Sequence, residues 1–358
     1  MPIRLASLFA ALALAGCASW SPTATTPTSQ DTTFEQGTPR RAARPVKVMI
    51  VTMFGPEAKT WLERLGPWDR IAVAGLSPDY PDVHCNRDGV CVMTTGMGHT
   101  NAAASAMALA FAPQFDLRRA YFLIAGIAGV NPEQGTLGST AWSDYLVDFG
   151  LQWEIDGDGR PAGWRTGYLG INTKDPTQTP ALDYHTEVFR LNPRLTDAAW
   201  MLSHDIALAD TPGMQAARAK YRDAPANRPP MVIRCDSVSD DTWWSGNALG
   251  ARASDWTREL TGNKGVYCMT QQEDNATFEA LKRAAATGRV DLDRVAVLRA
   301  GSDFDRPYRG ESNADNLLGY AGQGGFAPAL ENLFRAGNPV VQTIVTHWSD
   351  WRDGVPAR

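Results

Sequence analysis

The sequence predicts an α/β domain with a mixed, mostly parallel sheet. Short β-branched runs, such as residues 46–53 and 295–298, alternate with Ala-rich helical segments such as residues 102–111. The apolar runs are continuous, which is typical of strands covered by helices on both faces. Glycines and acidic residues follow several of these runs. Ligands of such sheets bind beyond the carboxyl ends of the strands, so we expect a site there.

The predicted elements form one domain, residues 46–352. Residues 151–230 are rich in proline and in turn residues, and we interpret them as an insertion or lid rather than a second domain. No internal repeat is visible. Strands are expected at residues 46–53, 90–95, 120–124, 136–149 and 295–298, and helices at residues 102–111, 276–286, 328–336 and 340–348.

Composition excludes several classes of protein. The chain has 358 residues, 44% of them hydrophobic and 20% charged, which is ordinary for a globular protein and unlike a disordered or fibrous one. The net charge is −5 without a long basic cluster, which argues against a nucleic-acid binder. Only the N-terminus is strongly apolar, so a polytopic membrane protein is excluded.

The N-terminus is typical of a secretory signal peptide. Arg4 precedes a short apolar run at residues 5–15, and Leu-Ala-Gly-Cys at residues 14–17 resembles the bacterial lipobox. We therefore expect a lipoprotein signal peptide at residues 1–16, a lipidated Cys17 and a flexible tether through residue 45. The alternative is an ordinary signal peptide that is cleaved near Ala18, with Cys17 incidental. Because no acidic residue follows Cys17 directly, the lipobox resemblance implies the periplasmic face of the outer membrane.

The other four cysteines suit an oxidising compartment. Cys85 and Cys91 flank an Asp-Gly pair that favours a tight hairpin turn, which would place the two cysteines across from each other. We therefore favour the pairs Cys85–Cys91 and Cys235–Cys268. The alternative is four free buried thiols.

Two glycine-rich segments follow predicted strands. Gly98 and His99 precede a predicted helix, and Gly126 and Gly129 follow the predicted strand at residues 120–124. Glycines let a backbone approach a ligand, and a helix N-terminus offers free N–H groups. Tight structural turns explain the same glycines equally well.

Four acidic residues lie just after predicted strands or just before a predicted helix. Glu57 follows the first strand, Glu273 and Asp274 precede a predicted helix, and Asp303 follows the last strand. A carboxylate can take a proton from water or hold a sugar diol, and partial burial would let Asp303 donate a proton. The alternative for each is a helix cap or a helix-terminal charge.

Aromatic residues offer stacking surfaces for a flat base. Trp142, Tyr145 and Trp243 are the candidates, although a chain with 12 Trp uses most of them in its core. Apart from His99 the histidines are scattered, and no CxxC pair is present. We therefore expect no metal site and no cofactor.

Taken together, these motifs resemble the purine nucleoside permease family, within the nucleoside phosphorylase-like superfamily. The resemblance extends over residues 46–350 and implies a three-layer fold, with a mixed sheet between helices and a site at the strand ends. It also implies a purine nucleoside as ligand and allows a homo-oligomer. The matching segments are residues 96–103, 125–131, 143–148, 267–274, 288–292 and 298–305.

The resemblance also implies roles for single residues. Glu273 matches the residue that holds the ribose hydroxyls, Asp303 the one that meets the purine at N7, and Glu57 the one that activates water. Trp142 and Tyr145 lie where the family holds the base or the ribose. The same resemblance marks its glycines, His99, Asp274 and Trp243 as further substrate-binding candidates.

These roles predict cleavage of the N-glycosidic bond, with Asp303 and Glu57 as catalytic residues. The phosphorylases of the superfamily carry an Arg just before the third-strand glycine segment, whereas residues 122–125 here are Phe-Leu-Ile-Ala. We therefore expect hydrolysis rather than phosphorolysis. The alternative function is a non-catalytic protein that captures nucleosides for transmembrane transport.

Overall fold

The computed structural model describes residues 42–357. The predicted signal peptide, Cys17 and most of the tether lie outside the described residues. Residues 42–357 include no helix with the length and apolarity that a membrane crossing requires.

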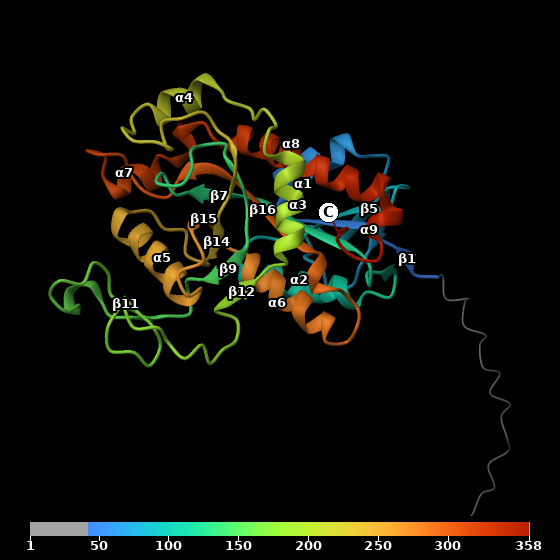
Figure 1. The fold of residues 1–358 in the computed structure, drawn as a ribbon, viewed down its shortest axis with the longest axis horizontal. Helices are drawn as coiled ribbons and strands as arrows, with labels where there is room; N and C mark the ends of the chain where they lie inside the picture. Colours follow the sequence, from blue (N-terminus) through green and yellow to red (C-terminus); the bar gives the residue numbers. More distant parts are fainter. Residues whose placement is uncertain (1–41, 358) are drawn as a thin grey trace, which may run out of the picture. The chain divides into compact units, whose positions relative to one another are not determined.

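A twelve-stranded mixed sheet forms the centre of the domain (Figure 1). Its main path runs β12-β9-β14-β15-β7-β2-β5-β4-β3, with β16, β8 and β13 joined beside β7. Pairing is parallel along β5-β2-β7-β16 and along β9-β14-β15. The strands are β2 (Val48–Thr52), β3 (Asp69–Ala72), β4 (Asp82–Cys85), β5 (Val90–Thr94), β7 (Tyr121–Val130), β8 (Thr140–Trp142), β9 (Tyr145–Asp148), β12 (Val188–Arg190), β13 (Val232–Arg234), β14 (Asp236–Ser239), β15 (Tyr267–Gln271) and β16 (Val295–Phe304).

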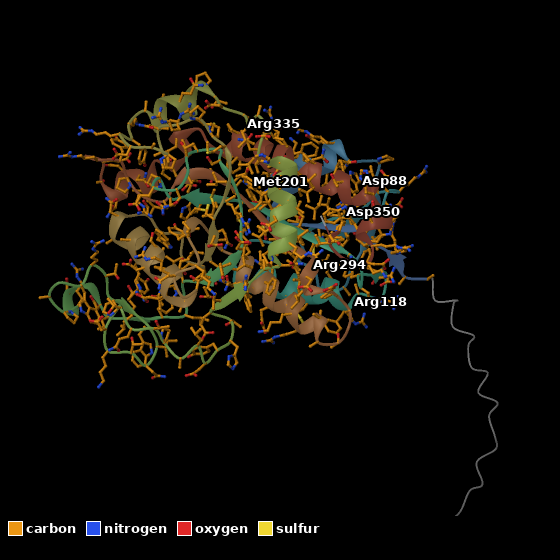
Figure 2. The ribbon with its side chains drawn as sticks, in the orientation of Figure 1. Asp88, Arg118, Met201, Arg294, Arg335 and Asp350 are labelled. Atoms are coloured by element: carbon orange, nitrogen blue, oxygen red, sulfur yellow. A yellow bond between two sulfur atoms is a disulfide. The ribbon has the colours of Figure 1, made fainter. Side chains whose placement is uncertain are left out.

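Helices cover both faces of this sheet, which confirms the predicted α/β class (Figure 1). Val48 and Ile50 of β2 belong to one core cluster, whereas the alternate residues Met49 and Val51 belong to another. Successive strand side chains point to opposite faces, so the two clusters are the two sides of the sheet. Figure 2 shows the side chains that fill these layers. One layer contains α1 (Gly55–Arg64), α3 (Pro193–Ser203) and α8 (Phe326–Thr346), and the other contains α2 (His99–Phe111) and α6 (Asp274–Ala285).

The remaining described elements are short or peripheral. Apart from α5, which follows β14, they lie mostly in connecting segments, and residues 151–230 are loop-rich as expected. They are β1 (Arg44–Pro45), β6 (Phe115–Asp116), β10 (Trp153–Glu154), β11 (Tyr168–Leu169), α4 (Pro212–Arg218), α5 (Asn247–Leu260), α7 (Asn313–Leu318) and α9 (Trp348–Trp351), with three short 3₁₀ turns.

Two central strands extend further than the sequence predicts. β7 and β16 pair in parallel from Val295 opposite Phe122 to Phe304 opposite Val130. The glycines at 126 and 129 and the acid at 303 therefore lie on strands, not in the loops we expected. Nine residues of each strand pair with a residue of the other, and this pairing outweighs the tendency of glycine to end a strand.

The predicted strand at residues 136–149 is divided in two. After β8, the backbone N–H groups of Asp144 and Tyr145 donate to Asp236 Oδ1, and the chain then starts β9. β8 pairs with β13 and β16, whereas β9 pairs with β12 and β14. By contrast, the two helical segments expected at the C-terminus are joined into the single helix α8, which contains Pro339.

Both expected disulfides are present. Cys85 and Cys91 are direct partners across the β4–β5 pair and are bonded to each other. Cys235, just before β14, is bonded to Cys268 of β15. The second disulfide therefore ties together two strands that end at the candidate site.

Candidate active site

A cavity of about 300 Å³ lies where the carboxyl ends of β2, β7, β14, β15 and β16 meet. This volume is at the lower end of the range for small-molecule pockets. Its walls combine carboxyl groups with aromatic and thioether side chains. They are formed by Met53, Phe54, Glu57, Met97, Ile127, Ala128, Gly129, Asp240, Thr242, Trp243, Thr270, Gln271, Gln272, Glu273, Arg299, Ser302, Asp303, Tyr320 and Phe326.

Glu57 is held at the first turn of α1 by backbone donors. Its Oε2 accepts from Met53 N at 2.7 Å and its Oε1 from Ile127 N at 2.7 Å. Burial raises the pKa of Glu57 to about 7, although the charge of Arg299 and these hydrogen bonds lower it. Glu57 can therefore exchange a proton near neutral pH.

Gly126 of β7 leaves space for the carboxylate of Glu57. A methyl group at position 126 would lie 2.8 Å from Glu57 Oε1 and 2.9 Å from Met53 Sδ, and would collide with Arg299. Only glycine leaves room for Glu57 to reach the backbone of β7. The predicted importance of Gly126 thus has a steric reason, although the glycine itself does not line the cavity.

Glu273 and Arg299 form a buried ion pair at the cavity wall. Glu273 Oε2 lies 3.2 Å from Arg299 Nη2, and its Oε1 accepts from Gly98 N at 3.1 Å. Burial alone would lower the pKa of Arg299, but Asp274 and Glu273 raise it above its ordinary value. Arg299 therefore keeps its charge and fixes Glu273 in place.

Asp274 completes this ion-pair network from outside the cavity. Its carboxylate receives Arg299 Nη2 at 2.6 Å and Ser237 Oγ at 2.6 Å, and the residue is fully buried. Since Asp274 does not line the cavity, the structure assigns it a positioning contact with Arg299 rather than the substrate contact that we expected.

Asp303 lies at the end of β16. Its Oδ1 accepts from Ser302 Oγ at 2.7 Å, and Trp243 supplies a second side-chain hydrogen bond. Burial raises the pKa of Asp303 to about 7, with a further rise from Asp305. The carboxyl group is therefore protonated in a large fraction of molecules at neutral pH, as a proton donor requires.

The structure does not bring every predicted residue to the cavity. Trp142 is fully buried in the core between sheet and helices and donates to Ser203 Oγ, so it cannot stack on a ligand. Tyr145 lies in β9, outside the cavity wall. We expected both near the ligand because their rings can stack on a base and because they match positions where the family holds the base or the ribose.

Gly98 and His99 contact acidic residues but do not line the cavity themselves. Gly98 has a φ of +87°, and its N–H donates to Glu273, so this position favours glycine. His99 Nδ1 lies 3.2 Å from Asp241 Oδ1 and its Nε2 lies 3.8 Å from Asp148 Oδ2. Neither residue lines the cavity, whereas Gly129 and Trp243 do.

Three kinds of wall residue were not expected from the sequence. Arg299 was overlooked because the expected position for an Arg was the third strand, yet it lies four residues before Asp303 on the same strand. Asp240 was overlooked because it follows β14, a strand that we did not predict. Phe54, Tyr320 and Phe326 carry no local signal, since only the fold brings them together.

The cavity contains the residue types that handle a sugar and a base, and no arrangement that suits a metal. Within residues 42–357, no group of three or more His, Cys, Asp or Glu side chains is placed to hold a metal ion.

A family model described as purine nucleoside permease matches residues 45–356, nearly all of the described chain. This chain belongs to the purine nucleoside permease family. Within that family, a protein named probable purine nucleoside permease from Schizosaccharomyces pombe is 39% identical over 324 residues, covering 87% of this chain and 92% of the relative. The purine nucleoside permease of Candida albicans is 38% identical over 307 residues, covering 84% and 75%.

Solved structures place this purine nucleoside permease family member in a known fold. A 5'-methylthioadenosine/S-adenosylhomocysteine nucleosidase from Neisseria meningitidis superposes with a TM-score of 0.50 at 13% identity, covering 83% of this chain and 99% of the other. The futalosine hydrolase of Helicobacter pylori gives 0.51 at 11% identity, covering 83% and 97%. These likenesses confirm the nucleoside phosphorylase-like three-layer fold that the sequence predicts.

Proposed function

We propose that this chain hydrolyses the N-glycosidic bond of a purine nucleoside. The observation that carries the proposal is the set of three carboxyl groups, Glu57, Glu273 and Asp303, in the wall of one cavity. Two of them have a pKa of about 7. The names of the family and of its relatives supply the purine nucleoside as ligand.

Each carboxyl group has one task in the proposed reaction. Asp303 gives its proton to N7 of the purine, so the base can leave with the electrons of the C1'–N9 bond. Glu273 accepts a hydrogen bond from a ribose hydroxyl as the sugar gains oxocarbenium character. Glu57 takes a proton from the water that attacks C1', which regenerates a neutral sugar hydroxyl. A positioned proton donor contributes about 10²–10⁴-fold to such a rate.

The charge distribution favours water over phosphate as the attacking group. Arg299 is the one Lys or Arg in the described wall, and its guanidinium is already bound to Asp274, Glu273, Gln271 and the Ile127 carbonyl. Three further carboxyl groups face the same space. A phosphate dianion would therefore meet repulsion without a free cationic partner, and burying an unpaired anion is costly.

The test measures release of free purine base from inosine, adenosine and guanosine by purified residues 42–358, with and without phosphate. We expect release without phosphate, no rise when phosphate is added, and at least a hundredfold loss in Asp303→Asn. Asp315→Asn, a change at an exposed side chain outside the cavity wall, is the matched control. Strict dependence on phosphate would contradict hydrolysis, and tight binding without release would favour nucleoside capture instead.

We also propose that the mature chain is an exported lipoprotein held at a membrane through Cys17. The support is the run of residues 1–17, in which a basic residue, a short apolar stretch and a lipobox-like sequence follow one another. Acyl chains on Cys17 would add about 0.8 kcal/mol of membrane affinity for each buried methylene group.

A further inference from the structure

One carboxyl group in the cavity wall has no task in the proposed reaction. Asp240 directly follows β14 and is only 8% exposed. Its Oδ1 accepts from Thr242 N at 3.0 Å, whereas its Oδ2 accepts no hydrogen bond from any residue of the described chain. Although the side chain is largely buried, this oxygen is accessible and Asp240 lines the cavity, so the oxygen is open to a donor that arrives with a ligand.

The strand order places Asp240 at the sugar end of the cavity. β14 pairs with β15, with Ser239 opposite Gln271, and Asp240 N donates to the Gln271 carbonyl at 2.8 Å. Glu273 therefore lies next to Asp240, whereas β15 and β7 separate Asp240 from the strand of Asp303. The base end is defined by Asp303, so Asp240 faces the ligand beside the ribose-binding carboxylate.

A shared backbone turn supports this placement. The N–H of Gly98 donates to Glu273 Oε1, and the N–H of His99 donates to Asp241 Oδ1 at 2.7 Å. Glu273 and the Asp240-Asp241 segment thus hold the same turn.

Glu273 alone has too few free acceptor positions for a diol. A carboxylate offers about four lone-pair positions. In Glu273, the protein already uses three of them, for Gly98 N, Arg299 Nη2 and Gln272 N. One hydroxyl can still be accepted there, so the second hydroxyl of a ribose needs another acceptor.

We infer that Asp240 is that second acceptor, and that it makes the site specific for nucleosides with an intact 2',3'-diol. One hydroxyl donates to Glu273 and the other to Asp240 Oδ2. This inference rests on the proposed function for the placement of base and sugar. It assigns Asp240 a role in sugar selection, not in the transfer of a proton.

The experiment compares Asp240→Asn with the control Asp223→Asn. Asparagine keeps the Oδ1 that accepts from Thr242, so the turn is retained while the charge of the free oxygen is removed. The Asp223 side chain is exposed and lies outside the cavity wall. Calorimetry gives Kd for adenosine, 2'-deoxyadenosine, 3'-deoxyadenosine and 5'-deoxyadenosine, with Asp303→Asn in the background to prevent turnover.

With Asp240 intact, we expect at least one of the 2'- and 3'-deoxy analogues to bind about 10–100-fold more weakly than adenosine. In Asp240→Asn this ratio should fall to about threefold or less for one of them, while the 5'-deoxy ratio stays unchanged. Asp223→Asn should keep every ratio. Equal weakening of all four ligands, or unchanged ratios in Asp240→Asn, would overturn the inference.

The same measurements separate this inference from the proposed function. If the chain with Asp303 intact releases no base but the ratios change in Asp240→Asn, hydrolysis is wrong and the role of Asp240 stands. If base is released and the ratios do not change, the proposed reaction stands and the role of Asp240 is wrong.

Discussion

At the scale of single residues, burial determines what Glu57 and Asp303 can do. Both are carboxylic acids whose ordinary pKa lies near 4, and burial raises each pKa to about 7. One carboxyl group must be protonated and the other ionised for the proposed reaction. Two groups with a pKa near the working pH can meet both demands in the same molecule.

The first prediction is a bell-shaped dependence of kcat/KM on pH, with its maximum near 7. Activity should fall below pH 7 as Glu57 gains a proton and above pH 7 as Asp303 loses its proton. For p-nitrophenyl riboside, whose leaving group needs no proton, we expect the alkaline limb to disappear. A flat profile between pH 5.5 and 8.5 for adenosine would contradict these roles.

A second prediction concerns stability. Because the pKa of Asp303 is higher in the folded chain than in the unfolded chain, its contribution to stability is complete below about pH 4 and is lost as pH rises through about 7. Asp303→Asn removes this dependence and keeps an acceptor for Ser302. Its melting temperature should exceed that of the wild type by a few degrees at pH 8, with a smaller difference at pH 5.

Thermal unfolding monitored by circular dichroism measures this difference at both pH values. Asp223→Asn, at an exposed side chain, controls for the loss of a carboxylate as such. A lower melting temperature for Asp303→Asn than for the wild type at pH 8 would contradict the idea that burial of the charged carboxylate destabilises the fold.

At the scale of elements, the sequence predicted those features that depend on local pattern. The runs at residues 46–53 and 90–95 became β2 and β5 with small changes at their ends. Continuous apolar runs and Ala-rich helices report burial directly, so the layers could be inferred.

Features that depend on contacts with distant segments of the same chain could not be inferred from the sequence. The extension of β7 and β16 through their glycines depends on their pairing with each other, which no local signal records. The same limit applies to Trp142, whose aromatic ring is equally suited to a core and to a base. It applies to Arg299 as well, since its role depends on three acids contributed by other elements.

The disulfides provide a prediction at this scale. Cys235–Cys268 closes a segment with a sequence separation of 33, and Cys85–Cys91 one of only 6. Loop-closure entropy then gives about 4 kcal/mol for the first and about 2 kcal/mol for the second. The double variant Cys235→Ser/Cys268→Ser should lower the melting temperature more than Cys85→Ser/Cys91→Ser does, and the reverse order would contradict the argument.

At the scale of the whole molecule, the family name refers to transport, whereas the described domain resembles enzymes in its fold. Residues 42–357 contain no helix suited to a membrane span, and the cavity has the size and groups of a small-molecule site. We propose that the lipobox-like run ending at Cys17 attaches the chain to a membrane through a lipid.

This gives a prediction for the full chain made in a bacterium. The wild type should enter the detergent phase in a phase-partition experiment, and mass spectrometry should find acyl groups on Cys17. Cys17→Ser should stay in the aqueous phase with unchanged nucleoside cleavage by the folded domain. Equal partitioning of both proteins would contradict lipid anchoring.

The central claim is that water attacks C1' of a purine nucleoside in this cavity. Its most direct test is the identity of the sugar product, measured by ¹H and ³¹P NMR after the purified domain has acted on inosine or adenosine in phosphate buffer. The account predicts free ribose together with free purine, and no new phosphate-ester signal. Formation of ribose 1-phosphate, or nucleoside that remains intact after saturating the site, would contradict it.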